Sequence, residues 1–149
     1  MKQQPTKRAT QGSTRTTPRA APSTRVRGST AETLALQYLQ AHGLGLVARN
    51  VRSPGRGGGE VDLIMTEPDG TLVFVEVRQR SSAMHGGAAA SIGWVKQRRI
   101  VFAARHFLAR LRKTPPCRFD AVLVDGELDG RQPPRIHWIR AAFDAAAWD

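Results

Sequence analysis

The chain has 149 residues and a formal net charge of +11, from 23 Lys and Arg against 12 Asp and Glu, which suits one folded domain with an extension. No apolar run approaches the ~20 residues that a membrane-spanning helix requires, and the basic N-terminus lacks the apolar core of a secretory signal, so no membrane partner is expected. The single cysteine, Cys117, excludes an internal disulfide and a cysteine-rich zinc site, which favours a reducing cytoplasm as the location.

Most of the positive charge lies in residues 1–28, which contain seven Lys and Arg and no acid. Met1 and Val26 are the only large apolar residues there, too few to offset the entropy of ordering the segment. Residues 1–28 are therefore predicted to be a disordered basic tail, and residues 29–149 a single folded domain. Such a tail attracts polyanions, including nucleic acid. A solubilising extension or a misplaced start codon explains the same composition.

The predicted domain begins with a helix over 29–42. Ser29 and Glu32 fit a capping box, in which the Glu side chain returns to the Ser29 amide. Apolar residues then recur every three or four positions until Gly43, which can end the helix. The sequence therefore predicts an amphipathic helix at the start of the domain.

Six further elements follow from the pattern of apolar residues and from the Gly and Pro residues between them. Two β-branched runs flank turn residues at 67–70 and predict a hairpin. A second amphipathic helix is expected from Ser91, as its N-cap, to the residue before Pro115. The five predicted strands, two of which form this hairpin, span 44–52, 61–65, 72–77, 119–124 and 136–139. Residues 141–148 can form an additional short helix. The order αβββαββ predicts a mixed α/β domain.

Two acids, Asp62 and Glu76, interrupt the apolar residues of the predicted hairpin. A three-residue loop with Gly70 in the left-handed conformation would pair Glu67 with Thr71 and place Asp62 opposite Glu76. Facing residues have Cβ atoms roughly 4.5–5.5 Å apart, so the two carboxylates would repel each other unless a cation lay between them. The pair therefore predicts a Mg²⁺ or Mn²⁺ site with Asp62 and Glu76 as metal ligands.

Neighbouring residues of the two strands extend this pattern. The two-residue period of a strand places Glu60 on the face of Asp62 and Arg78 on the face of Glu76, so the four side chains can form one cluster. In an alternative without metal, Arg78 neutralises Glu76 at a sheet edge. The glycine-rich segment 55–59 matches no nucleotide-binding fingerprint and is expected to be a flexible turn that lets a substrate backbone approach Asp62.

The same residues resemble a known protein family. The runs GEVDLI at 59–64, VFVEVR at 73–78 and GGAA at 86–89 closely resemble the YraN-like family, bacterial proteins classed as endonucleases on their fold and motif. The resemblance covers nearly all of 29–143 and leaves the tail unmatched. Further similar residues, in the family's order, are Glu32, Ala35, Tyr38, Leu39, Lys96, Cys117, Arg118, Phe119, Asp120, Trp138, Ala142 and Phe143.

This resemblance implies a restriction-endonuclease-like fold, distantly similar to archaeal Holliday-junction resolvases and to the wider PD-(D/E)xK nucleases. Asp62 then matches the metal-binding Asp, and Glu76 matches the Glu of the E-x-K element. Arg78 stands where Lys is usual in the superfamily. Lys can modulate the proton of an attacking water, whereas Arg stays protonated and can only orient a group or stabilise charge.

Two other residues are catalytic candidates, each with a structural alternative. Lys96 shares a helical stripe with Ile100 and Phe107, so it can point toward the sheet and supply the missing lysine, or simply extend along the helix surface. Glu32 resembles the Glu on the N-terminal helix of the resolvases, although the capping box also explains it.

Arginines flank the acid pair and follow one edge of the second predicted helix. Those beside the acids suit phosphate contacts, and those on the helix recur every seven residues, a spacing that also fits a solvated face. The candidate nucleic-acid-binding residues are Arg49, Arg52, Arg56, Arg80, Arg98 and Arg105. The histidines lack metal-ligand spacing and the aromatic residues fit apolar stripes, so both are expected to be structural.

These features together predict a Mg²⁺- or Mn²⁺-dependent phosphodiesterase that acts on DNA, with branched or structured DNA among the candidate substrates. Asp62 and Glu76 would hold the metal, and Arg78 or Lys96 would stabilise charge on the phosphate. One rival is a non-catalytic nucleic-acid-binding module with a nuclease fold. A second rival is an interaction subunit whose tail recruits an acidic protein. A homodimer is compatible with each.

Overall fold

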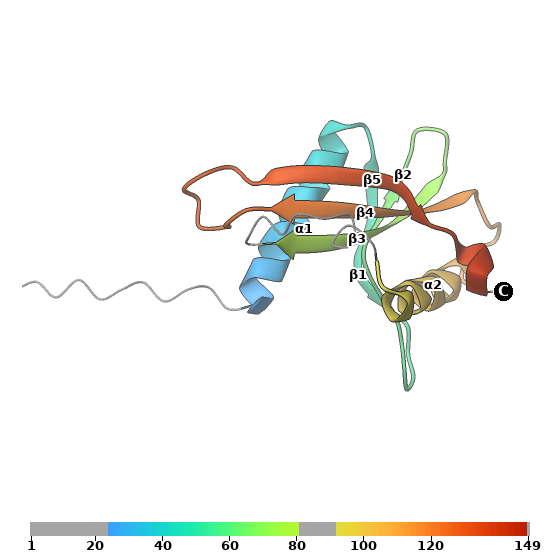
Figure 1. Ribbon diagram of the computed structural model, residues 1–149. Helices are drawn as coiled ribbons and strands as arrows, with labels where there is room; N and C mark the ends of the chain where they lie inside the picture. The colour runs from blue at the N-terminus through green and yellow to red at the C-terminus, as the bar shows by residue number, and fades with distance from the viewer. Residues whose placement is uncertain (1–23, 81–91, 149) are drawn as a thin grey trace, which may run out of the picture.

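The strand-forming runs of the sequence assemble into one five-stranded sheet in the computed structural model, which describes residues 24–80 and 92–148 (Figure 1). The strands lie in sequence order, and neighbours are antiparallel except β3 and β4, which are parallel. The elements are α1 (Thr24–Ala41), β1 (Gly45–Arg52), β2 (Glu60–Thr66), β3 (Leu72–Arg80), α2 (Trp94–Leu108), β4 (Cys117–Asp125), β5 (Arg135–Phe143) and the 3-10 helix η2 (Ala145–Trp148). The predicted order αβββαββ and the mixed α/β class are confirmed.

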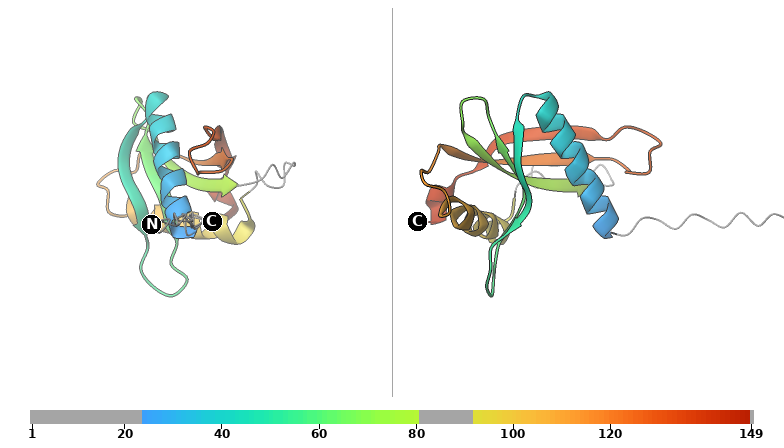
Figure 2. Two further views of the ribbon diagram at one scale, coloured as in Figure 1. Left: turned by 90° about the vertical axis from the view of Figure 1, so that its left-hand side faces the viewer. Right: turned by 180° about the vertical axis from the view of Figure 1, so that it is seen from behind.

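The two α-helices cover opposite faces of the sheet (Figure 2). α1 packs through Ala35 and Leu39 on the face that carries Val75. α2 packs through Ile100 on the face that carries Phe74. Because successive residues of a strand point to opposite faces, β3 is buried on both sides. Neither helix in the described ranges combines the length and apolar composition needed to cross a bilayer.

The β2–β3 hairpin has the predicted register. Gly70 adopts φ 90°, and its N–H donates to the carbonyl of Glu67 over 2.9 Å. Leu63 pairs with Val75, which is the register that places the two acids of the hairpin opposite each other. The turn residues therefore decide which side chains meet further along the strands.

The hairpin opens beyond the pair formed by Leu63 and Val75. From that point β2 pairs only with β1, and β3 pairs only with β4, as far as Arg80. Asp62 and Glu76 are the first residues past the last β2–β3 pair, and we call this point the β2–β3 split. The split matters because it leaves backbone groups of β2 and β3 without partners in the ladder between them, so that a side chain can take the place of a partner.

The start of α1 differs from the prediction. The helix begins at Thr24, so Ser29 lies inside it and the predicted capping box with Glu32 is wrong. The nearest upstream proline is Pro22, and the helix extends back almost to that residue. Residues 24–28, assigned to the tail, are thus the first turns of α1, and residues 1–23 lie outside the described residues.

Two further helix ends also differ. α2 begins after Gly93 and ends at Leu108, well before Pro115, and the predicted N-cap Ser91 lies outside the described residues. Leu111 continues the apolar stripe but is exposed, so no buried contact extends the helix to it. The predicted C-terminal helix is shorter because residues 141–143 continue β5.

The glycine-rich turn between β1 and β2 packs against α2 (Figure 1). A Cβ on Gly59 would collide with the carbonyl of Arg99, so glycine is needed here for a close approach to the helix backbone. Ser53 Oγ accepts a hydrogen bond of 2.7 Å from the Gly59 N–H, and Arg99 donates to the Gly58 carbonyl over 3.3 Å. The end of the turn at Gly58 and Gly59 is therefore held against α2 and fixes β2 there. At Gly55 and Gly57 a Cβ would meet no atom within 4 Å, so the expectation of a flexible turn is corrected only at its end.

Candidate active site

Asp62 lies at the β2–β3 split and bridges the two strands with its side chain. Its Oδ2 atom accepts a hydrogen bond of 2.8 Å from the backbone N–H of Val77, where the ladder between β2 and β3 has ended. The carboxylate thus takes the place of a backbone acceptor. Asp62 also interacts directly with Glu76, whose pKa it raises. The predicted convergence of the two acids is therefore confirmed.

Glu76 is a buried acid, 7% exposed. Burial, and then the negative charge of Asp62, raise the pKa of Glu76 from 4.5 to about 8, whereas Lys96 acts in the opposite direction. The Nζ atom of Lys96 lies 3.3 Å from Glu76 Oε2, yet no hydrogen bond from the described residues reaches this buried oxygen. A buried oxygen without a hydrogen bond, beside a second carboxylate, is an arrangement that a cation relieves.

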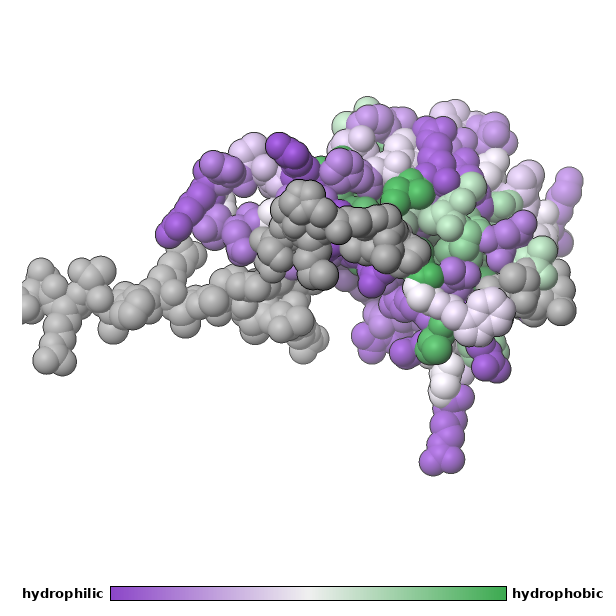
Figure 3. Space-filling view, in the orientation of Figure 1, coloured by the Kyte–Doolittle hydropathy of each residue, from purple (hydrophilic) through white to green (hydrophobic). Residues whose placement is uncertain are grey.

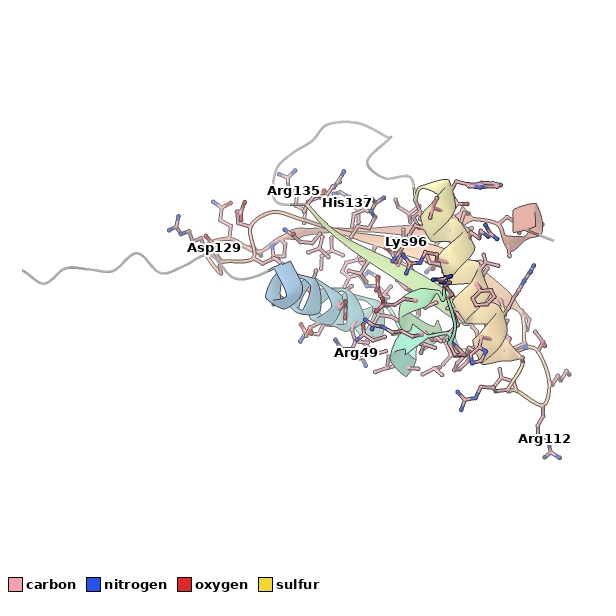
Figure 4. The ribbon with its side chains drawn as sticks, turned by 90° about the horizontal axis from the view of Figure 1, so that it is seen from below. Arg49, Lys96, Arg112, Asp129, Arg135 and His137 are labelled. Carbon is pink, nitrogen blue, oxygen red and sulfur yellow. The ribbon has the colours of Figure 1, made fainter. Side chains whose placement is uncertain are left out.

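Lys96 comes from the first turn of α2 and lies on the side of the helix that faces the strands (Figure 4). Its ion pair with Glu76 confirms that the side chain reaches toward the sheet, as the helical stripe predicts. The close approach of Gly59 to Arg99 and Ala103 holds β2 against the same helix, beyond the turn that carries Lys96. The helix therefore places one ammonium group next to the acid pair.

Glu32, on α1, interacts with Asp62 from the face of the sheet that α1 covers. Burial, and then the charge of Asp62, raise the pKa of Glu32. A hydrogen bond with the Asn50 side chain and the positive charge of Arg49, whose Nη2 lies 4.0 Å from Glu32 Oε2, lower it. These contacts explain Glu32, and capping does not. We call Glu32, Asp62, Glu76 and Lys96 the acid group.

Asn50 is a residue of the site that sequence patterns did not reveal. Its φ of 49° lies in the left-handed region, and the paired register of β1 with β2 omits the position where Asn50 would face Asp62. Asn tolerates this conformation better than most residues, and the irregularity in the edge strand accompanies its hydrogen bond to Glu32. The one available signal was an Asn within a predicted strand, where this residue is uncommon.

Glu60 and Arg78 lie at the margin of the acid group. Glu60 forms an ion pair of 3.1 Å with Arg52, so its charge is matched on β1. Arg78 is half-buried and pairs in register with Leu123 of β4. Glu60 also contributes through its charge to the raised pKa of Glu32, and Arg78 lies on the face of β3 that carries Glu76, so both remain neighbours of the acid pair.

The acid group fits a hydrated divalent cation better than a cage made of protein ligands alone. Mg²⁺ keeps several waters and is commonly bound through one or two carboxylates, which Asp62 and Glu76 can supply. The buried Oε2 of Glu76 is an oxygen that a cation could use. Within residues 24–80 and 92–148, no group of three or more His, Cys, Asp or Glu side chains is placed to hold an ion. Water or phosphate oxygens would have to complete the coordination of any ion bound here.

The predicted nucleic-acid-binding arginines fall into two sets. Arg80 forms two hydrogen bonds with Asp125, of 2.6 and 2.7 Å, and Arg49 and Arg52 pair with acids near the split. These charges are matched within the protein. The other set lies on the turn after β1 and on α2 and consists of Arg56, Arg98 and Arg105, whose side chains are exposed.

A second buried acid, Asp120, is fully hydrogen-bonded and is structural. It accepts from Arg118 Nε over 2.8 Å, from Trp138 Nε1 over 2.9 Å and from the Ala141 N–H over 2.9 Å. Arg118 also donates to Glu67 over 2.7 Å. Unlike Glu76, Asp120 offers no unsatisfied oxygen, so this network joins β4 to β5 and provides no ligand.

Comparison with known proteins gives the family. A family model described as "Uncharacterised protein family UPF0102" matches residues 31–124, more than half of the chain. The chain belongs to the UPF0102 family. The matched range runs from α1 to β4 and contains the whole acid group. The family description names no activity, so the function has to follow from the site.

Relatives in this family are similar over most of their length. The UPF0102 protein of Polaromonas naphthalenivorans (strain CJ2) is 62% identical over 125 residues, which cover 83% of this chain and 82% of the relative. The UPF0102 protein of Paracidovorax citrulli (strain AAC00-1) is 62% identical over 122 residues, with 82% and 85% covered. A UPF0102 protein of Cupriavidus taiwanensis is 55% identical over 126 residues, with 85% and 88% covered.

Proposed function

We propose that the chain is a divalent-metal-dependent nuclease that hydrolyses phosphodiester bonds in DNA. The observation that carries this proposal is the meeting of Asp62 and Glu76 at the β2–β3 split, with Lys96 3.3 Å from the buried Glu76 Oε2. Asp62 and Glu76 would hold the metal. When bound, Mg²⁺ or Mn²⁺ supplies polarisation of the phosphate and lowers the pKa of a water.

The two carboxylates are prepared differently for this role. Asp62 has one oxygen held by the Val77 N–H, which orients the carboxylate. Glu76 must lose its proton to become a ligand, so ligand formation is coupled to proton release at this residue. Its burial strengthens electrostatic interactions at the site, because the local dielectric constant is low.

Lys96 takes the role of the lysine that is usual where Arg78 stands. Its ammonium group carries three donors, which can contact a phosphate oxygen or the attacking water beside Glu76. Arg78 would stabilise negative charge on the phosphate. Glu32 would tune Asp62 through its charge.

The restriction-endonuclease-like fold belongs to the same proposal. It is supported by the mixed sheet in the order αβββαββ, with two acids beside the end of the hairpin pairing, and by the runs GEVDLI and VFVEVR. The resemblance to nucleases that act on branched DNA makes flaps and four-way junctions the first substrates to test.

Cleavage of labelled single-stranded, duplex, flap and four-way-junction DNA in Mg²⁺ or Mn²⁺ tests the function. Asp62→Asn and Glu76→Gln should each reduce cleavage about a hundredfold or more, because each removes a ligand charge from the site. Glu60→Gln is the matched control, since Glu60 is a neighbouring acid already paired with Arg52. Full activity in Asp62→Asn would contradict the assigned site.

A non-catalytic nucleic-acid-binding module is the second candidate. The ion pair of Lys96 with Glu76 favours it, because an internal cation partly offsets the buried charge without metal. Calorimetry separates the two: Mn²⁺ binding that is lost in Glu76→Gln supports the nuclease, and intact DNA binding without cation affinity supports the module. The remaining candidate, recruitment of an acidic protein, depends on the predicted tail, residues 1–28. Residues 1–23 of this tail lie outside the described residues.

A further inference from the structure

The outer face of α2 carries large apolar side chains that the core does not cover. Trp94, Val95 and Phe102 are 62%, 70% and 52% exposed. The aromatic residues were expected to fit the buried apolar stripes, but Trp94 and Phe102 do not, because α2 buries a different set that includes Ile100 and Ala104. Figure 3 shows green and pale side chains among purple ones over the position of α2. Exposed apolar surface of this kind often marks an interaction site.

A hollow of about 400 Å³ lies between this face of α2 and the turn that joins β1 to β2. Arg98 and Arg99 line it from the helix, and Arg56 lines it from the turn. None of the described residues that line it is acidic. The hollow therefore combines exposed aromatic surface with positive charge, a pairing that complements a polyanion with planar rings.

Trp94, Arg98 and Phe102 follow one another at four-residue spacing and form one stripe. At a rise of 1.5 Å per residue, neighbouring members of this stripe lie roughly 6 Å apart along the helix axis. Bases within one strand of a duplex are about 3.4 Å apart, so the stripe suits bases that have left the stack. Such bases stack on aromatic rings and on the planes of Arg side chains without regard to sequence.

We propose that this hollow binds an unpaired strand of nucleic acid, whose bases stack on Trp94 and Phe102 and whose phosphates pair with Arg56 and Arg98. The choice of DNA as the strand rests on the proposed nuclease function. Lys96, on the same helix, faces the acid group, so the hollow lies about one helix diameter, roughly 10 Å, from the reacting centre. The substrate would therefore carry an unpaired segment next to the bond that is cut, as a flap does.

A second copy of the chain fits the hollow less well. In a twofold interface the same patch meets itself, so the arginines of one copy would face those of the other. Like charges of this kind oppose association, and Arg98 lies in the middle of the apolar stripe between Trp94 and Phe102. The charge of the hollow therefore favours a polyanion.

Binding of a labelled oligothymidine strand and of a blunt duplex to the full chain in EDTA tests the proposal, since neither measurement needs metal or cleavage. Trp94→Ala and Phe102→Ala should each weaken strand binding about tenfold and change duplex binding less than about twofold, because only the strand offers free bases. Trp94→Phe keeps a ring and should retain most of the affinity. Leu111→Ala, at another exposed apolar residue, is the control and should leave both affinities unchanged.

Tryptophan fluorescence adds a readout of stacking itself. The strand should quench the emission of the unsubstituted protein, and Trp94→Phe should remove that quenching while strand binding persists. Circular dichroism of each variant checks that it is folded. We expect each variant to fold, because the substituted side chains are exposed and their replacement removes little buried surface.

Three results would overturn the proposal: equal weakening of strand and duplex binding, unchanged strand binding when Trp94 and Phe102 are both Ala, or conversion of a dimer to a monomer by that double substitution in sedimentation. The last result would assign the hollow to a second copy. A protein that binds the strand through Trp94 but cuts no DNA supports the hollow and contradicts the nuclease function, so the two failures are distinguishable.

Discussion

The buried carboxyl of Glu76 should make the metal-free protein less stable as the pH rises. Its pKa is about 8 in the folded protein against an ordinary 4.5, so between these values the folded state holds a proton that the unfolded state has released. The stability due to this proton is complete below about pH 4.5 and is lost as the pH rises to about 8. Each pH unit in that window lowers the folding equilibrium constant about tenfold, which is about 3 kcal/mol between pH 5 and pH 7.

Glu76→Gln tests this directly, because the amide has nearly the same shape and does not titrate. In urea unfolding with EDTA at pH 5, 6 and 7, the free energy of unfolding of the variant should rise relative to that of the unsubstituted protein by about 3 kcal/mol across the range. Glu60→Gln should follow the unsubstituted protein, since Glu60 lies at the margin of the site and pairs with Arg52. Parallel stability curves for Glu76→Gln and the unsubstituted protein would refute the reasoning.

Three further predictions concern metal binding at Glu76, the approach of Gly59 to α2 and the hydrogen-bond network of Asp120. Mn²⁺ should bind only when Glu76 is ionised, so its affinity for the protein should rise with pH up to about pH 8. Binding below that pH should release a proton, which calorimetry in buffers of different ionisation enthalpy detects. Binding without proton release would contradict this prediction. Gly59→Ala should cost about 2–3 kcal/mol of unfolding free energy through collision with the backbone of α2, whereas Gly93→Ala meets no atom within 4 Å and should cost less than about 0.5 kcal/mol. Asp120→Ala should lower the free energy of unfolding by about 3–5 kcal/mol, because it breaks the buried network. The exposed Asp129→Ala is the control and should lower it by less than about 0.5 kcal/mol. Similar decreases for the two variants would exclude a structural role for the buried network.

The hairpin could be predicted because local residues decide its register. The turn at 67–71 allows one short loop with Gly70 left-handed, and every facing pair then follows by counting. Helix ends were less predictable, because they depend on contacts with distant parts of the chain. Leu111 continues the helical period but lies over no core, and Ser29 has capping chemistry although α1 extends past it.

Much of the acid group could also be predicted, since Asp62 and Glu76 follow from the register and Lys96 from its helical stripe. The contacts of Glu32 could not, because they join α1 to β1 and β2 and depend on the left-handed conformation of Asn50. The exposed stripe on α2 was missed for a different reason. Apolar residues at helical spacing look alike whether they face inward or outward, and only the position of the sheet distinguishes Phe102 from the buried set.

A continuous sheet separates the side chains on its two surfaces, because the backbone ladder forms a barrier between them. Where β2 and β3 part, that barrier is interrupted. Glu32 of α1 interacts there with Asp62, and Lys96 of α2 pairs with Glu76, the neighbour of Asp62 across the split. A small chain can thereby gather chemical groups from both of its layers without a second domain or a long inserted loop. Substitutions in either layer can then change the electrostatics of the two interacting carboxylates, through Asp62 from one side and through Glu76 from the other.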